Sequence, residues 1–236
     1  MAAPPRLLGH RGCRAYPKVA ENTFAAFDLA LRHGCDGFEF DVRRNGSGGA
    51  VVCHDSKIGN VLIARASTEQ TQTLPLLEEV LRQYADRAFL DIELKVAGLE
   101  QAVLSALCEH PPQLGYLVSS FLPSVIIELS ARSGRIPLGI ICDKPSQRSS
   151  WMKLPVEYVV AEDGLVRPEL VKQVQDAGKK LLVWTVNDSA GMLRMRDWGV
   201  DGIISDDTEL LVRTLAPQSS GLYPRGPQRT EKAKSQ

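Results

Sequence analysis

The stretch from Asp36 to Asp55, DGFEFDVRRNGSGGAVVCHD, decides the fold. Its first part, residues 37–43, alternates as a β-strand does, with Phe38 and Phe40 on one face and Glu39 and Asp41 on the other. The link to the next apolar run, residues 50–54, holds little more than NGSGG. A parallel connection needs at least about ten residues, so this link predicts a hairpin and an antiparallel second strand.

Outward from this stretch, short apolar runs recur along most of the chain. They predict eight strands besides 37–43, at 6–10, 50–54, 88–95, 115–120, 137–142, 157–162, 180–187 and 201–205. All of these except 50–54 are expected to run parallel to 37–43. The fold class expected is α/β, a (β/α)₈ TIM barrel with a small extra antiparallel hairpin strand after the second barrel strand. A doubly wound open sheet is the alternative, which the lack of a G-x-G-x-x-G motif after the first strand weakens.

Helical spacing fills the segments between most strands. Residues 22–34 are expected to form a helix with Asn22 as the N-cap and Gly34 as the stop, and further helices are expected at 74–84, 167–178, 189–199 and 208–215. From residue 216 onward proline, glycine, serine and charge replace the periodic pattern. We therefore expect one barrel domain over residues 1–215 and a disordered polar tail over 216–236.

Composition narrows the range of partners. Lysine plus arginine equals aspartate plus glutamate, 28 residues of each kind, so no global field favours nucleic acid or an anionic membrane. No run approaches the ~20 apolar residues of a membrane span, and no signal peptide is recognised, so stable membrane insertion is not expected. The five scattered cysteines favour neither a disulfide framework nor a zinc site, and the expected compartment is the cytoplasm. The sequence does not indicate an oligomeric state.

A second strand repeats the pattern of charges on one face. In residues 88–95 the side chains of Asp91, Glu93 and Lys95 share a face, opposite the apolar one. The outer face of a barrel strand packs on helices, so these charges and those of Glu39 and Asp41 should point into the barrel. Converging carboxylates suit a hard divalent cation such as Mg²⁺ or Ca²⁺. A buried charge network neutralised by Lys95 without a metal is the alternative.

Two histidines accompany the carboxylates. His10 ends the first strand in GHRG, and His54 ends the hairpin strand, followed by Asp55, which could orient it. Histidine is suited to proton transfer near neutral pH. Arg11 and Lys95 supply positive charge for a phosphate group.

Taken together, these segments resemble the glycerophosphodiester phosphodiesterase family. The resemblance rests on an ordered set of motifs: GHRG (9–12), ENTFAAF (21–27), FEFDVR (38–43), HD (54–55), LLEEVL (76–81), DIELK (91–95), SSF (119–121), VWTVN (183–187) and DGIISD (201–206). It implies a (β/α)₈ barrel that hydrolyses small-molecule glycerophosphodiesters to glycerol 3-phosphate and an alcohol.

The resemblance also implies roles for individual residues. The histidines His10 and His54 act as general acid and base, and Glu39, Asp41 and Glu93 hold the divalent metal. Arg11 and Lys95 contact the phosphate, and Trp184 and Phe121 lie on the wall of the pocket. For Trp184, a core tryptophan at a strand end is the alternative.

The chain departs from the family pattern in two places. Ala20 stands where the family usually has proline. Residues 56–73 form a short polar run where the family often has an arginine-threonine-threonine stretch and a small helical insertion. A reduced lid leaves the site more open, which brings in a lysophospholipase D-like activity on the same scaffold as an alternative. A catalytically inactive barrel that binds phosphodiesters is the other alternative.

Overall fold

The computed structural model describes residues 3–147 and 150–216. Apart from its first residue, the predicted tail at 216–236 lies outside the described residues. The last helix of the described residues ends at Leu215, and the domain boundary expected after residue 215 stays a prediction.

The described part of the chain forms a closed barrel, as expected. A nine-stranded sheet has the order β1-β11-β10-β9-β8-β7-β6-β2-β3, and a further pairing of β1 with β2 closes it. Its eight parallel strands are β1 (Arg6–Gly9), β2 (Gly37–Arg44), β6 (Phe89–Leu94), β7 (Tyr116–Ser120), β8 (Leu138–Cys142), β9 (Tyr158–Glu162), β10 (Lys180–Trp184) and β11 (Gly202–Ser205). The fold is therefore a TIM barrel and not an open sheet.

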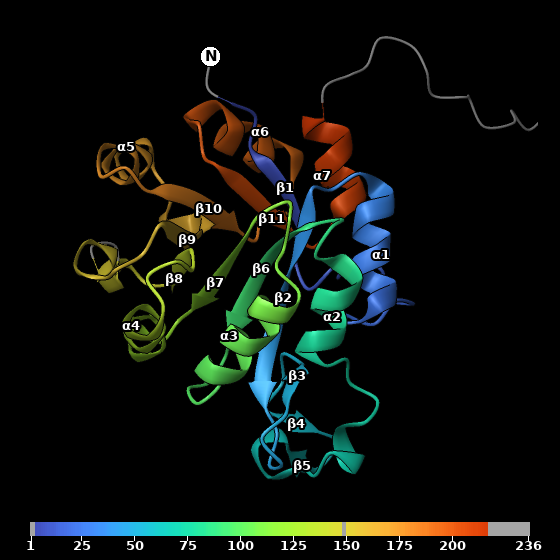
Figure 1. Cartoon of the computed structure of the whole chain (residues 1–236). Coiled ribbons are helices and arrows are strands. Elements are labelled where there is room, and N and C mark those ends of the chain that lie inside the picture. The colour runs from blue at the N-terminus through green and yellow to red at the C-terminus, as the bar shows by residue number, and fades with distance from the viewer. Residues whose placement is uncertain (1–2, 148–149, 217–236) are drawn as a thin grey trace, which may run out of the picture.

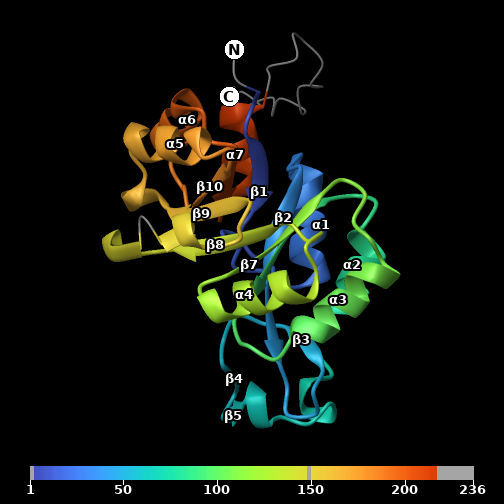
Figure 2. The ribbon, with the colours of Figure 1, turned by 60° about the vertical axis from the view of Figure 1, so that its left-hand side comes forward.

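The hairpin argument is confirmed. Strand β3 (Ala50–Val52) pairs antiparallel with β2, Val42 opposite Val52. A short hairpin that the sequence did not suggest follows, formed by β4 (Lys57–Ile58) and β5 (Val61–Leu62). Figures 1 and 2 both show β3, β4 and β5 together at the end of the barrel to which β2 points. The polar run at 56–73 thus contains this hairpin and two single turns of 3₁₀ helix, η1 (Ile63–Arg65) and η2 (Glu69–Thr71).

Helices cover the outside of the barrel. They are α1 (Phe24–His33), α2 (Leu77–Tyr84), α3 (Glu100–Glu109), α4 (Pro123–Arg132), α5 (Pro168–Asp176), α6 (Ser189–Trp198) and α7 (Thr208–Leu215). Between β8 and β9 the described residues form the 3₁₀ turns η3 (Pro145–Gln147) and η4 (Ser150–Lys153) instead. None of the described helices is long and apolar enough to cross a lipid bilayer.

The alternation along the strands separates two apolar regions. Phe38 and Phe40 on β2 face outward into the layer between sheet and helices, where Phe27 of α1 stacks on Phe38 at 4.2 Å between ring centroids. Inside the barrel lies a smaller cluster, made of Leu8, Phe89, Leu117, Ile141, Tyr158, Val160, Leu182 and Ile204. This cluster includes no residue of β2 and only Phe89 of β6, and the later inward positions of these two strands carry carboxylates.

Two local predictions were wrong. The N-cap of α1 is Thr23, whose hydroxyl accepts a hydrogen bond from the Ala26 amide, and not Asn22. Asn22 has a φ of 58° and turns its side chain into the barrel, so it cannot cap the helix. Strand β10 ends at Trp184, so residues 185–187 are not strand; the side chain of Asn187 instead contacts Asp206.

Candidate active site

A cavity opens at the C-terminal ends of the strands, where TIM barrels carry their active sites. Its lining has two halves. The polar half comes from β2, β6 and the segments that follow β1, β3 and β6, and the apolar half from β8 to β11 and the residue after β7. The lining residues are His10, Arg11, Glu39, His54, Asp91, Glu93 and Lys95 on the polar side and Phe121, Ile141, Val160, Trp184 and Ile204 on the apolar side.

The loop after β1 brings its charged residues into the barrel through tight backbone contacts. A Cβ at Gly9 would lie 1.8 Å from the carbonyl oxygen of Gly12, and one at Gly12 would lie 2.7 Å from the backbone of Ala26 in α1. Only glycine allows both approaches. Arg11 between them has a φ of 50°, and its amide donates to Glu39 Oε2 at 3.0 Å. The loop is thereby fixed against β2.

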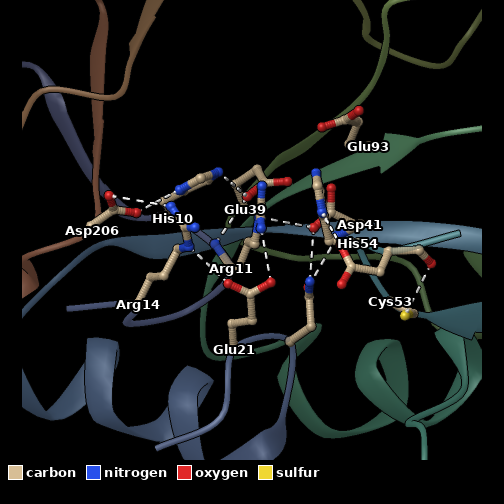
Figure 3. Close-up of polar contacts among 12 residues, drawn as sticks. His10, Arg11, Arg14, Glu21, Glu39, Asp41, Cys53, His54, Glu93 and Asp206 are labelled. Carbon is tan, nitrogen blue, oxygen red and sulfur yellow. Dashed lines mark hydrogen bonds and ion pairs between the residues drawn. The ribbon is translucent and has the colours of Figure 1, made fainter. Parts of the chain in front are cut away.

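Three carboxylates converge within this polar half. Register places Asp41 of β2 beside Glu93 of β6, and Glu39 lies two residues before Asp41 on the same face. One oxygen from each of Glu39, Asp41 and Glu93 lies within 4.8 Å of the others, and all three residues are buried. This arrangement agrees with the prediction that these acids point into the barrel, and Figure 3 shows all three side chains.

The two lining cations pair with these acids. Lys95 Nζ lies 3.1 Å from Asp41 Oδ1 and 2.7 Å from Glu93 Oε1. Arg11 Nε lies 3.3 Å from Asp41 Oδ2, and its Nη1 donates to Glu21 at 2.8 Å. Both cations border the cavity, but their first partners in this structure are carboxylates. They neutralise only part of the negative charge.

Proton affinities differ within the cluster. Burial alone would raise the pKa of Asp41, yet Lys95, the Asn22 amide donating at 2.8 Å and Arg11 together hold it below its ordinary value. Burial raises the pKa of Glu93 to about 7, although Lys95 opposes the rise. The pKa of Glu39 is raised well above its ordinary value by burial and by the charges of Asp41 and Glu93.

A fourth acid lines the same cavity. Asp91 is opposite Glu39 in the β2–β6 register and is 0% exposed. Its Oδ1 accepts a 2.6 Å hydrogen bond from the hydroxyl of Ser119, whereas its Oδ2 has no partner among the described residues. Burial raises the pKa of Asp91 to about 7.

The acid cluster fits a divalent cation. Carboxylate oxygens are the ligands that Mg²⁺ and Ca²⁺ prefer, and three of them within one small volume suit coordination from one side. Glu39 Oε1 is buried and has neither a hydrogen bond nor an ion pair within the described ranges. A network neutralised by Lys95 alone would leave this oxygen and Asp91 Oδ2 without compensation, so it explains the site less completely.

His10 is held by a partner that sequence reasoning missed. Its Nδ1 lies 2.6 Å from Asp206 Oδ1, directly after β11, and its Nε2 lies 3.9 Å from Glu39 Oε2. In Figure 3 the imidazole of His10 lies between these two acids. Asn187 donates to Asp206 Oδ2 at 2.8 Å and accepts from the Asp206 amide at 2.9 Å, which fixes the carboxylate. Burial opposes it, but the hydrogen bond from His10 lowers the pKa of Asp206.

His54 has a similar but more open environment. Its Nδ1 lies 2.9 Å from Asp55 Oδ1, and the side chains of the two residues are 33% and 79% exposed. Because β3 ends at Val52, Asp55 is free to turn beside His54, as the sequence left open. Arg43 on β2 donates to the backbone carbonyl of His54 at 2.7 Å, which ties the loop to the barrel.

The two predicted wall residues face each other across the apolar half. The rings of Phe121 and Trp184 meet edge to face, with 5.8 Å between their centroids, and the centroid of the Trp184 ring lies 6.5 Å from that of His10. The indole Nε1 of Trp184 has no hydrogen-bond partner among the described residues. Trp184 is thus part of the cavity wall and not only of the core.

Sequence reasoning missed Asp206, Asn187 and Asn22 as members of the site. A signal existed for each, because all three lie in motifs that mark the ends of strands or the loop after β1, namely DGIISD, VWTVN and ENTFAAF. What the sequence lacked was the pairing of Asp206 with a histidine 196 residues away.

Comparisons with known proteins agree with this geometry. The sequence model of the glycerophosphoryl diester phosphodiesterase family matches residues 10–71 and 65–210. A glycerophosphodiester phosphodiesterase of Caldanaerobacter subterraneus subsp. tengcongensis is 30% identical over 237 residues, which cover 89% of this chain and 97% of the relative.

Solved structures show the same fold. A phosphodiesterase from Oleispira antarctica, determined in complex with the product sn-glycerol-3-phosphate, matches with a TM-score of 0.77 and 25% identity over 89% of this chain and 96% of its own. A structure from Silicibacter pomeroyi with the same fold matches with a TM-score of 0.81 at 22% identity, and the match covers 90% of this chain and 93% of the other. The barrel, the matched sequence model and the 30% identical relative together establish that this chain belongs to the glycerophosphoryl diester phosphodiesterase family of enzymes.

Proposed function

We propose that this protein hydrolyses small-molecule glycerophosphodiesters to glycerol 3-phosphate and an alcohol, with Glu39, Asp41 and Glu93 holding one divalent cation, Mg²⁺ or Ca²⁺. The observation that carries the proposal is the meeting of a buried acid triad and two aspartate-paired histidines around one cavity. When bound, the cation would supply charge neutralisation for the phosphodiester.

The chain's own residues bind and orient the substrate. Lys95 and Arg11 border the cavity and carry positive charge, so they attract the phosphate while balancing the acids. Phe121 and Trp184 form a wall beside His10 against which the organic part of the substrate packs. The free indole N–H of Trp184 offers a donor to a substrate oxygen.

The two histidines divide the proton transfers. The role of base falls to His10, because Asp206, whose pKa is lowered, lies at Nδ1 and would stabilise the imidazolium that forms when Nε2 takes a proton from the attacking oxygen. His54 then donates a proton to the leaving alcohol, and its open position suits release of the product. The attacking oxygen belongs to water or to the 2-hydroxyl of the glycerol group. In the second case a cyclic phosphate forms as the alcohol leaves, and water then opens it to glycerol 3-phosphate.

Substitution of each histidine tests the assignment. His10→Ala and His54→Ala should each lower turnover of glycerophosphocholine about 100-fold or more. His110→Ala, which removes a histidine at the end of α3, is the matched control and should leave turnover unchanged. Chelation with EDTA should abolish activity, and added Mg²⁺ or Ca²⁺ should restore it. Full activity of both site variants would refute the proposal.

The acid and the base can be separated with a second substrate. A glycerol phosphodiester of p-nitrophenol has a leaving group that needs no protonation. His54→Ala should regain most of its activity on this substrate, whereas His10→Ala should not. The reverse pattern would exchange the two roles.

A lysophospholipase D-like activity is the second candidate. It is favoured by the aliphatic side chains Ile141, Val160 and Ile204 in the cavity and by the short β4–β5 hairpin at the rim. Assays of lysophosphatidylcholine beside glycerophosphocholine separate the two, and the higher kcat/KM decides. An inactive phosphodiester-binding barrel would show binding without cation-dependent turnover.

We further infer a cytoplasmic location, which the five free cysteines support.

A further inference from the structure

Asp91 lies beside Glu39 on the neighbouring strand β6 and has no role in the chemistry outlined above. We propose that Asp91 sets the affinity of the site for its divalent cation without ligating it, at the expense of the stability of the metal-free protein. The inference rests on the proposed cation site and assigns a role to a residue outside the ligand set.

The surroundings of Asp91 are those of a buried charge with incomplete compensation. The residue is 0% exposed, and among the described residues the hydroxyl of Ser119 is its one hydrogen-bond donor. Oδ2 has no partner in the same part of the chain, and no cation pairs with either oxygen. Burying a carboxylate in this way costs several kcal/mol in a protein, and an amide or apolar side chain would avoid that cost.

The position of Asp91 directs its charge at the cation site. It is the register partner of Glu39 and lies two residues before Glu93 on the inward face of β6. It does not belong to the group whose oxygens lie within 4.8 Å of one another. A charge that lies beside the ligands without joining them acts on a bound cation through its electric field, which falls off only slowly where little water intervenes.

The charge balance of the barrel interior is consistent with this role. Two cations, Arg11 and Lys95, pair with the acids of the cluster. When all are ionised, they face four carboxylates, those of Glu39, Asp41, Asp91 and Glu93. Arg11 is also shared with Glu21, so negative charge exceeds positive charge at the site, and Asp91 adds one unit to an excess that a divalent cation would offset.

The test compares the full-length protein with its Asp91→Asn variant, which keeps the shape and removes the charge. Titration calorimetry with MgCl₂ and with CaCl₂ measures affinity, and thermal unfolding in EDTA measures the stability of the metal-free form. We expect Asp91→Asn to bind both cations about 10- to 100-fold more weakly, the range found when residues behind metal ligands are changed. We also expect its melting temperature in EDTA to rise.

The opposite signs separate this role from a structural one. Glu100→Gln is the control: Glu100 is also a buried acid, but both of its oxygens face the Gly98 amide at the start of α3, away from the cavity. It should lower the melting temperature and leave cation affinity unchanged.

Two results would overturn the proposal. One is cation binding by Asp91→Asn within threefold of the wild type, and the other is a lower melting temperature in EDTA. If the wild type binds cation and is active but Asp91→Asn binds equally well, the proposed function stands and this inference alone fails. If the wild type binds neither cation, both fail.

Discussion

His10 and Asp206 are 196 residues apart in the chain, yet their side chains meet at 2.6 Å between Nδ1 and Oδ1. The contact exists because β1 pairs with β11 in register, Gly9 beside Ser205, which brings the residues after both strands to the same point of the rim. An aspartate at Nδ1 selects the tautomer that leaves Nε2 directed at the cavity.

Asp206→Asn should therefore impair the reaction with little effect on substrate binding. The amide can present an N–H to Nδ1 and so favour the wrong tautomer of His10. We expect kcat for glycerophosphocholine to fall about 100- to 10,000-fold with KM changed less than threefold. Steady-state kinetics measure both constants, and a variant that keeps a wild-type kcat would show that the contact does not orient the base.

The same contact predicts a pH dependence of stability. Because the pKa of Asp206 is lowered in the folded protein, the unfolded chain takes up its proton first as the pH falls. The stabilisation is thus fully present above about pH 4 and is lost as the pH falls through the lowered pKa. We expect wild type and Asp206→Asn to differ by about 2 kcal/mol in unfolding free energy at pH 6, and we expect this difference to shrink as the pH falls below about 4. Urea titrations measure this, and a pH-independent difference would contradict it.

Lys95 should matter for stability as well as for the substrate. Its side chain is 13% exposed and bridges Asp41 and Glu93, so Lys95→Met leaves two buried acids without their main counter-charge. We expect the metal-free protein to lose about 3 kcal/mol of unfolding free energy, part of which a divalent cation restores. Chemical unfolding with EDTA and with MgCl₂ measures the effect. Equal stability of both proteins in EDTA would mean that the acids do not depend on Lys95.

Neighbouring residues at the start of α1 should respond differently to alanine. Thr23→Ala removes the N-cap and should cost about 1 kcal/mol of stability with no loss of kcat. Asn22→Ala removes the amide that bonds both the carboxylate and the backbone N–H of Asp41, at 2.8 and 3.2 Å, and should lower activity. Unfolding curves and kinetics on both variants check this. A loss of activity in Thr23→Ala alone would contradict it.

Much of the barrel could be predicted because the relevant physics is local. The period of two in residues 37–43 and the short link to Ala50 determine the faces of β2 and the antiparallel pairing of β3 without knowledge of the rest of the chain. The same alternation placed Asp91 and Glu93 on the inward face of β6 and Lys95, directly after the strand, at the cavity.

The remainder depended on tertiary contacts. Asn22 and Thr23 are both residue types that favour the N-cap position. Thr23 occupies this position because the side chain of Asn22 donates to Asp41 on β2 instead. The pairing of Asp206 with His10 and the double ion pair of Lys95 likewise follow from barrel closure and register, which no spacing in the sequence encodes. The roles of the site residues remain predictions.

The closure of β1 between β2 and β11 also has a consequence for biosynthesis. A nascent chain that has reached residue 200 already carries the three acids and both imidazoles, but it lacks the strand and the carboxylate that orient the first imidazole. Turnover should appear only after the final β-strand has been made and docked, so enzyme activity during translation would report the last step of folding and not the first.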